Sequence, residues 1–333
     1  MVRRLSRPRQ VTWSPSLTLV PTRQCFNACG YCSFRLPPDQ VAAGLPGDAL
    51  ADGEAAAALE ARPLALEVLL LSGEVAPQSP GRRAWFARLL ALSRLALQAG
   101  RLPHTNAGPL ALGEMAALGR LNPSMGLMLE GLGPAYDHLH RHAPSKRLEL
   151  RLAQIEQAGR LGIPFTTGLL LGLGESRAER LEALELLALI QGQWGHIQEV
   201  ILQPWRPDGA AAGPLPPQAV AELLELIEAA RTILPPQVHL QLPPNLWPQE
   251  RLVDALEAGI DDLGGIDLHD VINPAYPQRQ PDALARRLAA AGWQLHPRLC
   301  VHAEWWGWLP RSLAVRLERC RHRLQRLDPG PSG

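Results

Sequence analysis

Three cysteines lie close together near the start of the chain, in the segment Cys25-Phe26-Asn27-Ala28-Cys29-Gly30-Tyr31-Cys32. Three thiolates at this C-x₃-C-x₂-C spacing can ligate three irons of a 4Fe–4S cluster, and the fourth iron stays open to a small molecule with an amine and a carboxylate. A structural zinc site needs four ligands, but the first histidine of the chain is the distant His104. We therefore interpret Cys25, Cys29 and Cys32 as cluster ligands, with a zinc site or structural thiols as the alternatives.

An alternation of short apolar runs and longer helical patterns must position this loop. The runs that predict strands are residues 16–20, 64–71, 103–105, 124–129, 165–171, 197–202, 238–242 and 262–266. Helical periodicity lies between them, for example at residues 146–161, 175–190 and 220–233. Eight such units without a break in composition predict an α/β fold, a single (β/α)₈ TIM-type barrel.

The predicted barrel covers residues 13–293, between a basic N-terminal arm at residues 1–12 and a short C-terminal extension at residues 294–333. The extension begins with a strand-like piece and ends in a predicted helix at residues 311–327. Pro46, Gly47 and Gly53 interrupt residues 39–61, which we expect to form a broken helix or a long loop. Residues 137–142 carry three histidines beside an arginine, and we expect this segment to be solvated.

Polar and glycine residues gather at or beside the predicted strand ends. They are Gly73, Glu74, Asn106, Glu130, Gly172, Glu175, Gln203, Asn245, Asp261 and Asp262. In a parallel barrel the carboxyl ends of the strands meet at one face, and reactive residues collect there. Glycine, asparagine and aspartate also occur at strand ends for turn reasons alone, but the complete set indicates a site at that face.

The composition is that of a globular protein, with 333 residues, 46% of them hydrophobic, and a net charge of +1. A charge this near zero argues against a nucleic-acid-binding or basic membrane-surface protein. No apolar run approaches the roughly 18 residues that a membrane span needs, and the N-terminal segment lacks the apolar core of a signal peptide. Five cysteines do not suggest a secreted disulfide framework. We expect a cytoplasmic protein with neither nucleic acid nor membrane as a partner.

The cysteine triplet, with the aromatic Tyr31 before its last cysteine, resembles the radical S-adenosylmethionine (SAM) superfamily. The resemblance implies two cofactors, one 4Fe–4S cluster held by the three cysteines and SAM on the open iron. It further implies that Gly73 and Glu74, which match the superfamily's GE motif, meet the methionine end of SAM. Glu130 matches a position that contacts the ribose. The stretch 168–175, with Gly172 and Glu175, matches the glycine motif beside the adenine.

Longer segments resemble one family of that superfamily, the CofG-type subunits of deazaflavin synthases. These segments are residues 13–35, 104–108, 125–130, 163–168, 196–201, 243–246 and 259–266. The resemblance implies a lyase that takes a hydrogen atom from an adduct of a hydroxybenzyl group with a ribityl-substituted uracil, closes a ring and releases ammonia. The residues that would then meet the substrate are Asn106, Gln203, Asn245, Asp261 and Asp262.

The same resemblance implies two protein partners, a second radical SAM subunit of the CofH type and an electron donor such as flavodoxin or ferredoxin. Two departures from the family pattern stand out: Val75 replaces a basic residue after the GE motif, and an Ala- and Pro-rich segment follows Trp205. The alternatives are another radical SAM reaction, either methyl transfer or sulfur insertion, with Cys300 or Cys320 as an extra thiol, and a non-enzymatic iron–sulfur protein.

Overall fold

Eight parallel strands close into a barrel in the computed structural model, which describes residues 9–38, 47–209 and 213–327. The strands are β1 (Gln10–Leu19), β2 (Glu67–Leu71), β3 (Leu102–Asn106), β4 (Ser124–Gly126), β5 (Phe165–Leu171), β6 (Ile197–Pro204), β7 (His239–Gln241) and β8 (Asp262–Ile266). Each strand pairs with the next, and β1 closes the ring because it pairs with both β2 and β8. The predicted TIM-type barrel is confirmed.

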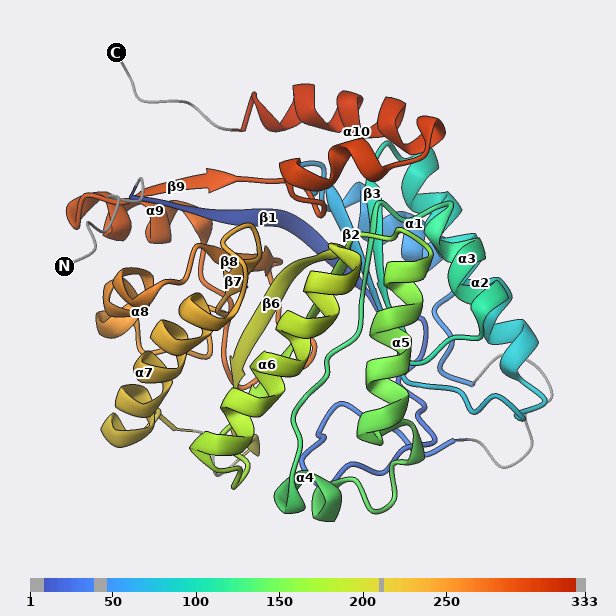
Figure 1. The fold of residues 1–333 in the computed structure, drawn as a ribbon. Coiled ribbons are helices and arrows are strands. Elements are labelled where there is room, and N and C mark those ends of the chain that lie inside the picture. The colour runs from blue at the N-terminus through green and yellow to red at the C-terminus, as the bar shows by residue number, and fades with distance from the viewer. Residues whose placement is uncertain (1–8, 39–46, 210–212, 328–333) are drawn as a thin grey trace.

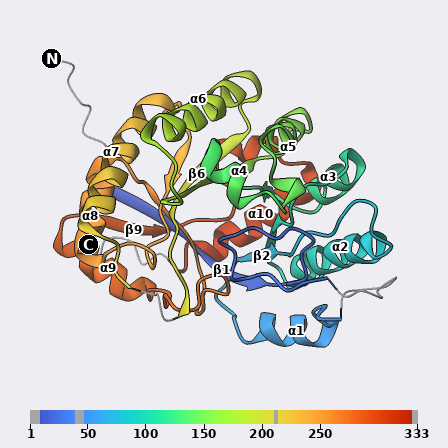
Figure 2. The same cartoon turned by 90° about the horizontal axis from the view of Figure 1, so that it is seen from below.

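Helices surround the barrel, as the two views in Figure 1 and Figure 2 show. They are α1 (Asp52–Glu60), α2 (Arg82–Gln98), α3 (Leu112–Gly119), α4 (Pro134–Leu139), α5 (Leu148–Arg160), α6 (Arg177–Trp194), α7 (Pro217–Ile233), α8 (Leu252–Ala258), α9 (Pro281–Ala290) and α10 (Arg311–Leu324). Short 3₁₀ turns occur at η1 (Pro144–Lys146), η3 (Gln249–Arg251) and η4 (Ala303–Trp308). The strand–helix alternation continues around the whole ring.

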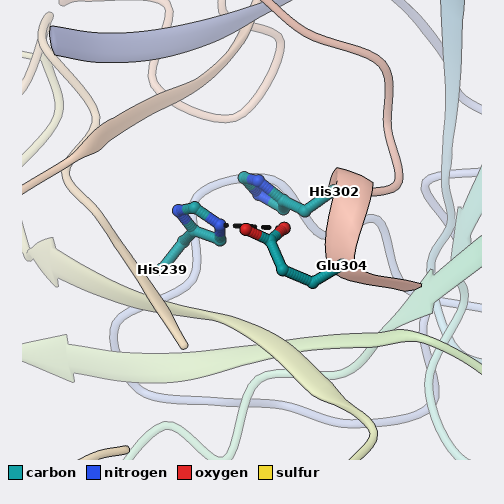
Figure 3. A group of neighbouring side chains, drawn as sticks. All are labelled: His239, His302 and Glu304. Carbon is teal, nitrogen blue, oxygen red and sulfur yellow. Dashed lines mark ion pairs between the residues drawn. The ribbon is translucent and has the colours of Figure 1, made fainter. Parts of the chain in front are cut away.

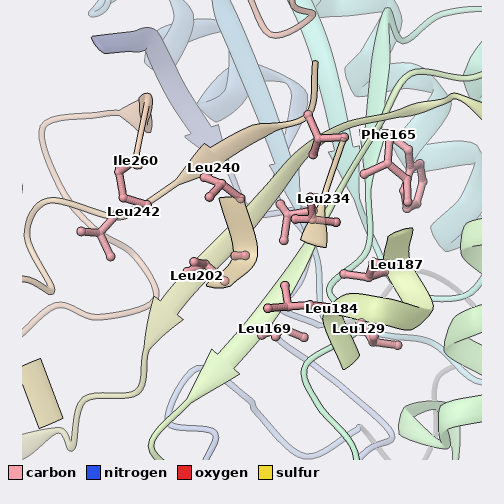
Figure 4. Close-up of a cluster of buried hydrophobic side chains, with 14 of the residues drawn as sticks. Leu129, Phe165, Leu169, Leu184, Leu187, Leu202, Leu234, Leu240, Leu242 and Ile260 are labelled. Carbon is pink, nitrogen blue, oxygen red and sulfur yellow. The ribbon is translucent and has the colours of Figure 1, made fainter. Parts of the chain in front are cut away.

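Strand β5 shows why the apolar runs of this chain become barrel strands. All seven of its residues are buried, because the barrel interior covers one face of the strand and helices cover the other. Phe165 and Leu169 of β5 belong to the same buried cluster as Leu184 and Leu187 of α6 (Figure 4). Gly168 lets β6 approach closely, since a Cβ atom at this position would lie 2.4 Å from a backbone oxygen.

Helix α6 carries its start and stop signals in its sequence. The hydroxyl of Ser176 accepts a hydrogen bond from the Glu179 amide, and the Glu179 carboxylate accepts one from the Ser176 amide, which makes a capping box. Gly195 ends the helix at a φ of 69°, a left-handed conformation that glycine adopts at little cost. These two caps determine where α6 begins and ends.

The C-terminal extension closes the amino end of the barrel. Strand β9 (Gln294–Pro297) pairs in parallel with Gln10–Trp13 of β1, and α10 lies across the end of the barrel opposite α4 (Figure 1). Leu317 and Cys320 of α10 pack in one buried cluster with Leu66 and Leu102. The predicted strand-plus-helix extension is therefore a packed part of the barrel.

Two strands differ in length from the prediction. Strand β1 begins at Gln10, six residues earlier than predicted, because its first four residues pair with β9. Strand β4 ends at Gly126, and the chain then turns at Glu130, whose φ is 75°. The early start of β1 comes from a tertiary partner that a local sequence pattern does not contain.

Parts of two predicted segments, residues 1–8 of the basic arm and residues 39–46 of the broken helix or loop, lie outside the described residues. The remainder of the second segment contains α1, so residues 52–60 are helical. Among the described residues, no helix combines the length and apolar character that crossing a membrane requires.

Candidate functional site

The cysteine loop follows β1 and lies at the end of the barrel opposite α10 (Figure 1). Hydrogen bonds of its own backbone hold it in place: the amide of Cys25 donates to Leu36 at 3.0 Å, and the amide of Gly30 donates to Leu139 at 2.9 Å. Cys25 and Cys29 are partly buried, Cys32 is exposed, and all three thiols are free. The loop therefore presents three reduced cysteines at the carboxyl-end face that the sequence predicts.

The surroundings of the cysteines affect their protonation. Burial, with the negative charge of Glu74 as a second cause, raises the pKa of Cys25. Burial likewise raises the pKa of Cys29 to about 12. A thiol must lose its proton to bind a metal, so this loop favours thiolates only when a strongly cationic group such as iron compensates their charge.

Gly73 brings the end of β2 against the cysteine loop. Its amide donates to the Thr22 carbonyl at 2.7 Å, and a Cβ atom at Gly73 would lie only 2.1 Å from the carbonyl oxygen of Gln24. The Phe26 amide in turn donates to the backbone carbonyl of Glu74 at 3.0 Å. A residue with a side chain does not fit at position 73, which explains the glycine of the GE pair physically.

The side chain of Glu74 is buried among donors. Its carboxylate accepts hydrogen bonds from Asn27 at 2.9 Å, from Arg151 at 2.8 Å, and from the hydroxyl of Ser145. Burial by itself would raise the pKa of Glu74, but Arg151 and then Lys146 outweigh it and hold the pKa below its ordinary value. Glu74 is therefore a carboxylate at neutral pH.

Glu130 lies beside Glu74 and belongs to the segment that follows β4. Its carboxylate accepts from Tyr31 and from Lys146, and His140 lies 3.2 Å away. Burial opposes ionisation of Glu130, yet Lys146 and the neighbouring histidine hold its pKa well below the usual range. The left-handed backbone of Glu130 is uncommon for a residue with a side chain. Such strained positions cluster at functional sites.

Two cations join these two carboxylates into one group. Lys146 pairs with Glu130 and lies 3.5 Å from Glu74, and Arg151 lies 4.0 Å from Glu130. The side chain of Arg151 is 1% exposed, and its Nε has no hydrogen-bond partner in the described part of the chain. This balanced set of charges beside three thiols can bind a zwitterionic ligand, with carboxylates for its ammonium group and a guanidinium for its carboxylate.

A cavity of about 370 Å³ opens beside this group and extends into the barrel. It brings together nine of the predicted site residues, namely Cys25, Cys29, Cys32, Gly73, Glu74, Asn106, Glu130, Gln203 and Asn245. Its deeper wall is polar and includes Glu67, Glu199 and Arg298. One cavity thus connects the cysteine loop to a polar barrel interior.

Two residues predicted beside the adenine lie outside this cavity. The Glu175 carboxylate accepts hydrogen bonds from the amides of Gly172 at 2.7 Å and Leu173 at 2.8 Å, and it pairs with Arg180. Glu175 therefore shapes the turn after β5, and Gly172 forms part of that turn at a φ of 95°. From this segment Leu170 lines the cavity instead.

Two residues predicted to contact the substrate also lie elsewhere. Asp262 begins β8, so it lies at the amino end of the barrel, where it pairs with Arg298 and is fully buried. Asp261 precedes β8 and accepts a hydrogen bond from the Leu240 amide at 2.8 Å. In a parallel barrel the catalytic face is built from the carboxyl ends of the strands and the loops that follow them, and neither aspartate lies there. The structure therefore gives both aspartates structural partners.

Several residues of the site were missed by sequence reasoning. Asn27, Lys146 and Arg151 line the cavity, and His140 contacts both Tyr31 and Glu130. His140 lies in the segment expected to be solvated, which is wrong for this residue because its side chain is only 8% exposed. One signal was available: Lys146 is the only lysine of the chain.

A second group of titratable side chains lies outside the cavity (Figure 3). The rings of His239 and His302 stack at 3.7 Å with 11° between their planes, and Glu304 lies 3.6 Å from His239. Burial opposes protonation of His239, but Asp261 and Glu304 outweigh it and raise its pKa to about 9. The nitrogen lone pairs of two stacked rings lie in two nearly parallel planes, which is a poor arrangement for both rings to bind one metal ion. We interpret the group as an ion-paired cluster.

Comparisons with known proteins agree with this geometry. The radical SAM superfamily profile matches residues 19–187. The 7,8-didemethyl-8-hydroxy-5-deazariboflavin synthase of Synechococcus elongatus is 51% identical over 92% of this chain and 91% of its own. The enzyme of the same name from Thermosynechococcus vestitus is 48% identical over 93% of this chain and 98% of its own.

Solved structures support the fold. The FeFe-hydrogenase maturase HydG from Carboxydothermus hydrogenoformans superposes with a TM-score of 0.70 at 18% identity, covering 96% of this chain and 78% of that one. Methylornithine synthase (PylB) gives a TM-score of 0.61 at 14% identity, covering 86% and 84%. With a closed barrel, a cysteine loop over a polar cavity and this degree of identity over nearly its full length, the chain belongs to the 7,8-didemethyl-8-hydroxy-5-deazariboflavin synthases of the radical SAM superfamily.

Proposed function

We propose that this chain converts 5-amino-5-(4-hydroxybenzyl)-6-(D-ribitylimino)-5,6-dihydrouracil into 7,8-didemethyl-8-hydroxy-5-deazariboflavin. The reaction removes a hydrogen atom with a 5′-deoxyadenosyl radical, closes a ring and releases ammonia. The observation that carries this proposal is the single cavity that joins the cysteine loop to a polar barrel interior. The identity of about 50% with named synthases supports the choice of product.

The residues at the cavity mouth fit the two cofactors that the superfamily uses. Cys25, Cys29 and Cys32 are free, grouped on one loop, and of the type that binds iron. When bound, a 4Fe–4S cluster held by them supplies the electron that cleaves SAM into methionine and a 5′-deoxyadenosyl radical. Glu74 is an ionised acceptor for the methionine ammonium, and Arg151 offers on the same wall an Nε that has no partner in the part of the chain that the structure describes.

The barrel interior fits a flat polar heterocycle with a polyol tail. Asn245 is buried against the cavity, and its Oδ1 has no hydrogen-bond partner among the described residues. This oxygen can accept from a ring N–H of the uracil. Asn106 and Gln203 offer further donors and acceptors to the same ligand. Enclosure within the barrel limits the access of water to a radical.

The proposed reaction needs partners. One cysteine triplet provides one radical generator per chain, so a second radical SAM subunit of the CofH type must form the adduct from tyrosine and a ribityl-aminouracil. We place the chain in the cytoplasm, with flavodoxin or ferredoxin as the electron donor.

A reconstitution experiment tests the proposed function. The chain, loaded with iron and sulfide under anaerobic conditions, receives reductant, SAM and the purified adduct. We expect the deazaflavin chromophore, ammonia and 5′-deoxyadenosine in equal amounts. We also expect no chromophore from tyrosine and the ribityl-aminouracil until the partner subunit is added. An adduct that stays intact in the presence of a loaded cluster would contradict the proposed reaction.

A further inference from the structure

The inner end of the cavity holds buried charges that the cofactor contacts do not use. Glu199 of β6 and Arg298, which follows β9, line the cavity, and Asp262 of β8 lies directly behind them. Their side chains are 4%, 10% and 0% exposed, respectively. Glu67 of β2 adds a third buried carboxyl group. The inner end of the cavity therefore has three acidic groups and a single guanidinium close to them.

The hydrogen bonds distribute the charge unequally between Asp262 and Glu199. Arg298 binds both oxygens of Asp262, and Asp262 accepts further hydrogen bonds from Thr12 and from a backbone amide. Glu199 accepts a hydrogen bond from Arg298 at 2.9 Å and one from the hydroxyl of Thr166 at 3.0 Å, and its carboxyl group also shares a hydrogen bond with that of Asp262. Because Asp262 has more donors, it is the member of the pair that stays ionised.

The protonation of the pair follows from this arrangement. Burial opposes ionisation of Asp262, yet Arg298 holds the pKa of Asp262 below its ordinary value. Burial raises the pKa of Glu199 to about 8; the positive charge of Arg298 opposes this increase, and the negative charge of Asp262 adds to it. His302 faces the pair with an Nε2 that has no hydrogen-bond partner within residues 9–38, 47–209 and 213–327, and burial holds its pKa far below the usual range. Glu199 therefore carries a proton at neutral pH and can release it in the physiological range.

Other ionisable groups of the cavity are poor proton donors at neutral pH. Glu74 and Glu130 are held as carboxylates by cations. Burial lowers the pKa of His104 to about 3, so its ring is neutral. Burial and Glu130 raise the pKa of Tyr31 far above its usual range. Among these groups, Glu199 has the pKa nearest the working pH, which is the condition for efficient acid–base catalysis.

This inference rests on the proposed function, in which ammonia must leave the adduct. We propose that Glu199 is the general acid that protonates the departing amino nitrogen. The carbon–nitrogen bond breaks with its electron pair on nitrogen, and the nitrogen takes the proton of Glu199. The neighbouring ring position loses a proton, its electron pair forms the new double bond, and the Glu199 carboxylate accepts that proton. The acid is thereby restored, and the step needs no further reactant.

Arg298 and Asp262 act through Glu199 as positioning residues. Arg298 stabilises the carboxylate that exists between the two proton transfers, because its contact to Glu199 is a charge-assisted hydrogen bond. Asp262 binds Arg298 through both of its oxygens, and its negative charge offsets part of the effect by which Arg298 lowers the pKa of Glu199. Glu67 lies at the same end of the cavity, and burial raises its pKa too, although the positive charge of Arg298 opposes the increase. Glu67→Gln is therefore the matched comparison.

The test uses the iron-loaded chain with reductant, SAM and the purified adduct. The experiment compares wild type with three variants, Glu199→Gln, Glu199→Asp and Glu67→Gln. For each protein we measure iron content, SAM affinity and the formation of 5′-deoxyadenosine, ammonia and chromophore. We expect Glu199→Gln to keep iron content, SAM affinity and first-turnover 5′-deoxyadenosine within about twofold. Its ammonia and chromophore formation should fall by about a hundredfold or more, the usual contribution of a general acid.

The pH profile separates an acid from a structural group. The wild-type rate of ammonia release should fall as the pH rises above about 8, because Glu199 then loses its proton. In Glu199→Gln this fall in rate at alkaline pH should be absent. In Glu199→Asp part of the rate should return, and the fall should occur at a different pH. In Glu67→Gln the fall should occur at the same pH as in wild type. If Glu199→Gln loads no iron, the pH profile of Glu199→Asp is the test. If its rate of ammonia release falls at the same pH as in wild type, the proposal is overturned.

Two failures remain distinguishable. A loaded wild-type chain that leaves the adduct unchanged overturns the proposed function, and the role of Glu199 with it. A wild-type chain that forms the chromophore, beside a Glu199→Gln variant that releases ammonia equally fast, overturns only the role of Glu199.

Discussion

Arg151 and Glu74 form a buried ion pair beside the cysteine loop, with Nη2 of the guanidinium 2.8 Å from the carboxylate. Glu74 lies at the end of β2 and Arg151 in the first turns of α5, so the pair connects two units of the barrel. A buried charge that loses its partner is costly, about 3–5 kcal/mol. The pair therefore holds Glu74 ionised and in one position before any ligand arrives.

Replacing Glu74 by glutamine should weaken SAM binding while the cluster still forms. The neutral amide keeps the shape of the side chain but loses the charge that attracts an ammonium group. We expect a roughly ten- to hundredfold loss of affinity, from about 1.5–3 kcal/mol for a hydrogen bond to a charged group. Equilibrium dialysis under anaerobic conditions measures it. Glu114→Gln, which removes the partner of Arg82 outside the cavity, is the control, and equal affinities in both variants would disprove the assignment.

Replacing any one of Cys25, Cys29 or Cys32 by alanine should abolish the cluster and SAM cleavage. Reconstituted wild type should contain about four irons and four sulfides per chain. Cys320→Ala, which changes a buried thiol under α10, should keep the same iron content, and so should Cys300→Ala. Iron and sulfide analysis gives the answer, and a wild-type value near eight irons would reveal a second cluster.

Replacing Gly73 by alanine should displace the cysteine loop. The added Cβ would lie 2.1 Å from the Gln24 carbonyl oxygen, so the backbone must move, and overpacking of this kind costs about 1–3 kcal/mol. We expect a lower melting temperature and poor iron loading. Gly113→Ala in α3 adds the same methyl group where nothing lies within 4 Å, and it should lower neither quantity.

Replacing Asp262 by asparagine should destabilise the fold rather than weaken substrate binding. Arg298 would lose its bidentate partner inside the barrel, a loss of about 3–5 kcal/mol for a broken buried pair. Because Arg298 lowers the folded-state pKa of Asp262 against the effect of burial, the stabilisation is complete above the ordinary aspartate pKa and disappears as the pH falls through the folded-state value. Thermal unfolding at several pH values tests this. The more exposed Asp261→Asn should cost less.

The sequence predicted the barrel because each strand-forming run is short, apolar and followed by helical periodicity, as Phe165–Leu171 shows. The sequence also predicted the cysteine triplet and Gly73-Glu74 as site residues, because each motif consists of residues that are close together in the chain. Arg151 was not predictable, because its partner Glu74 lies 77 positions away and only folding brings them together. For Asp262 the signal was present, because it is the first residue of the predicted strand 262–266 and the structure keeps those bounds. The first residue of a parallel barrel strand lies at the amino end, away from the face where reactive residues collect.

The pairing of β9 with the first residues of β1 has a practical consequence for anyone who shortens this protein. The eight-stranded barrel looks complete without its C-terminal extension, but removing that extension would leave Gln10–Trp13 without its neighbour and uncover Leu66 and Leu102. An unpaired strand edge beside exposed leucines is a template for edge-to-edge aggregation. Residues 294–327 therefore protect the barrel from aggregation, and a barrel without them should be recovered mainly as aggregate.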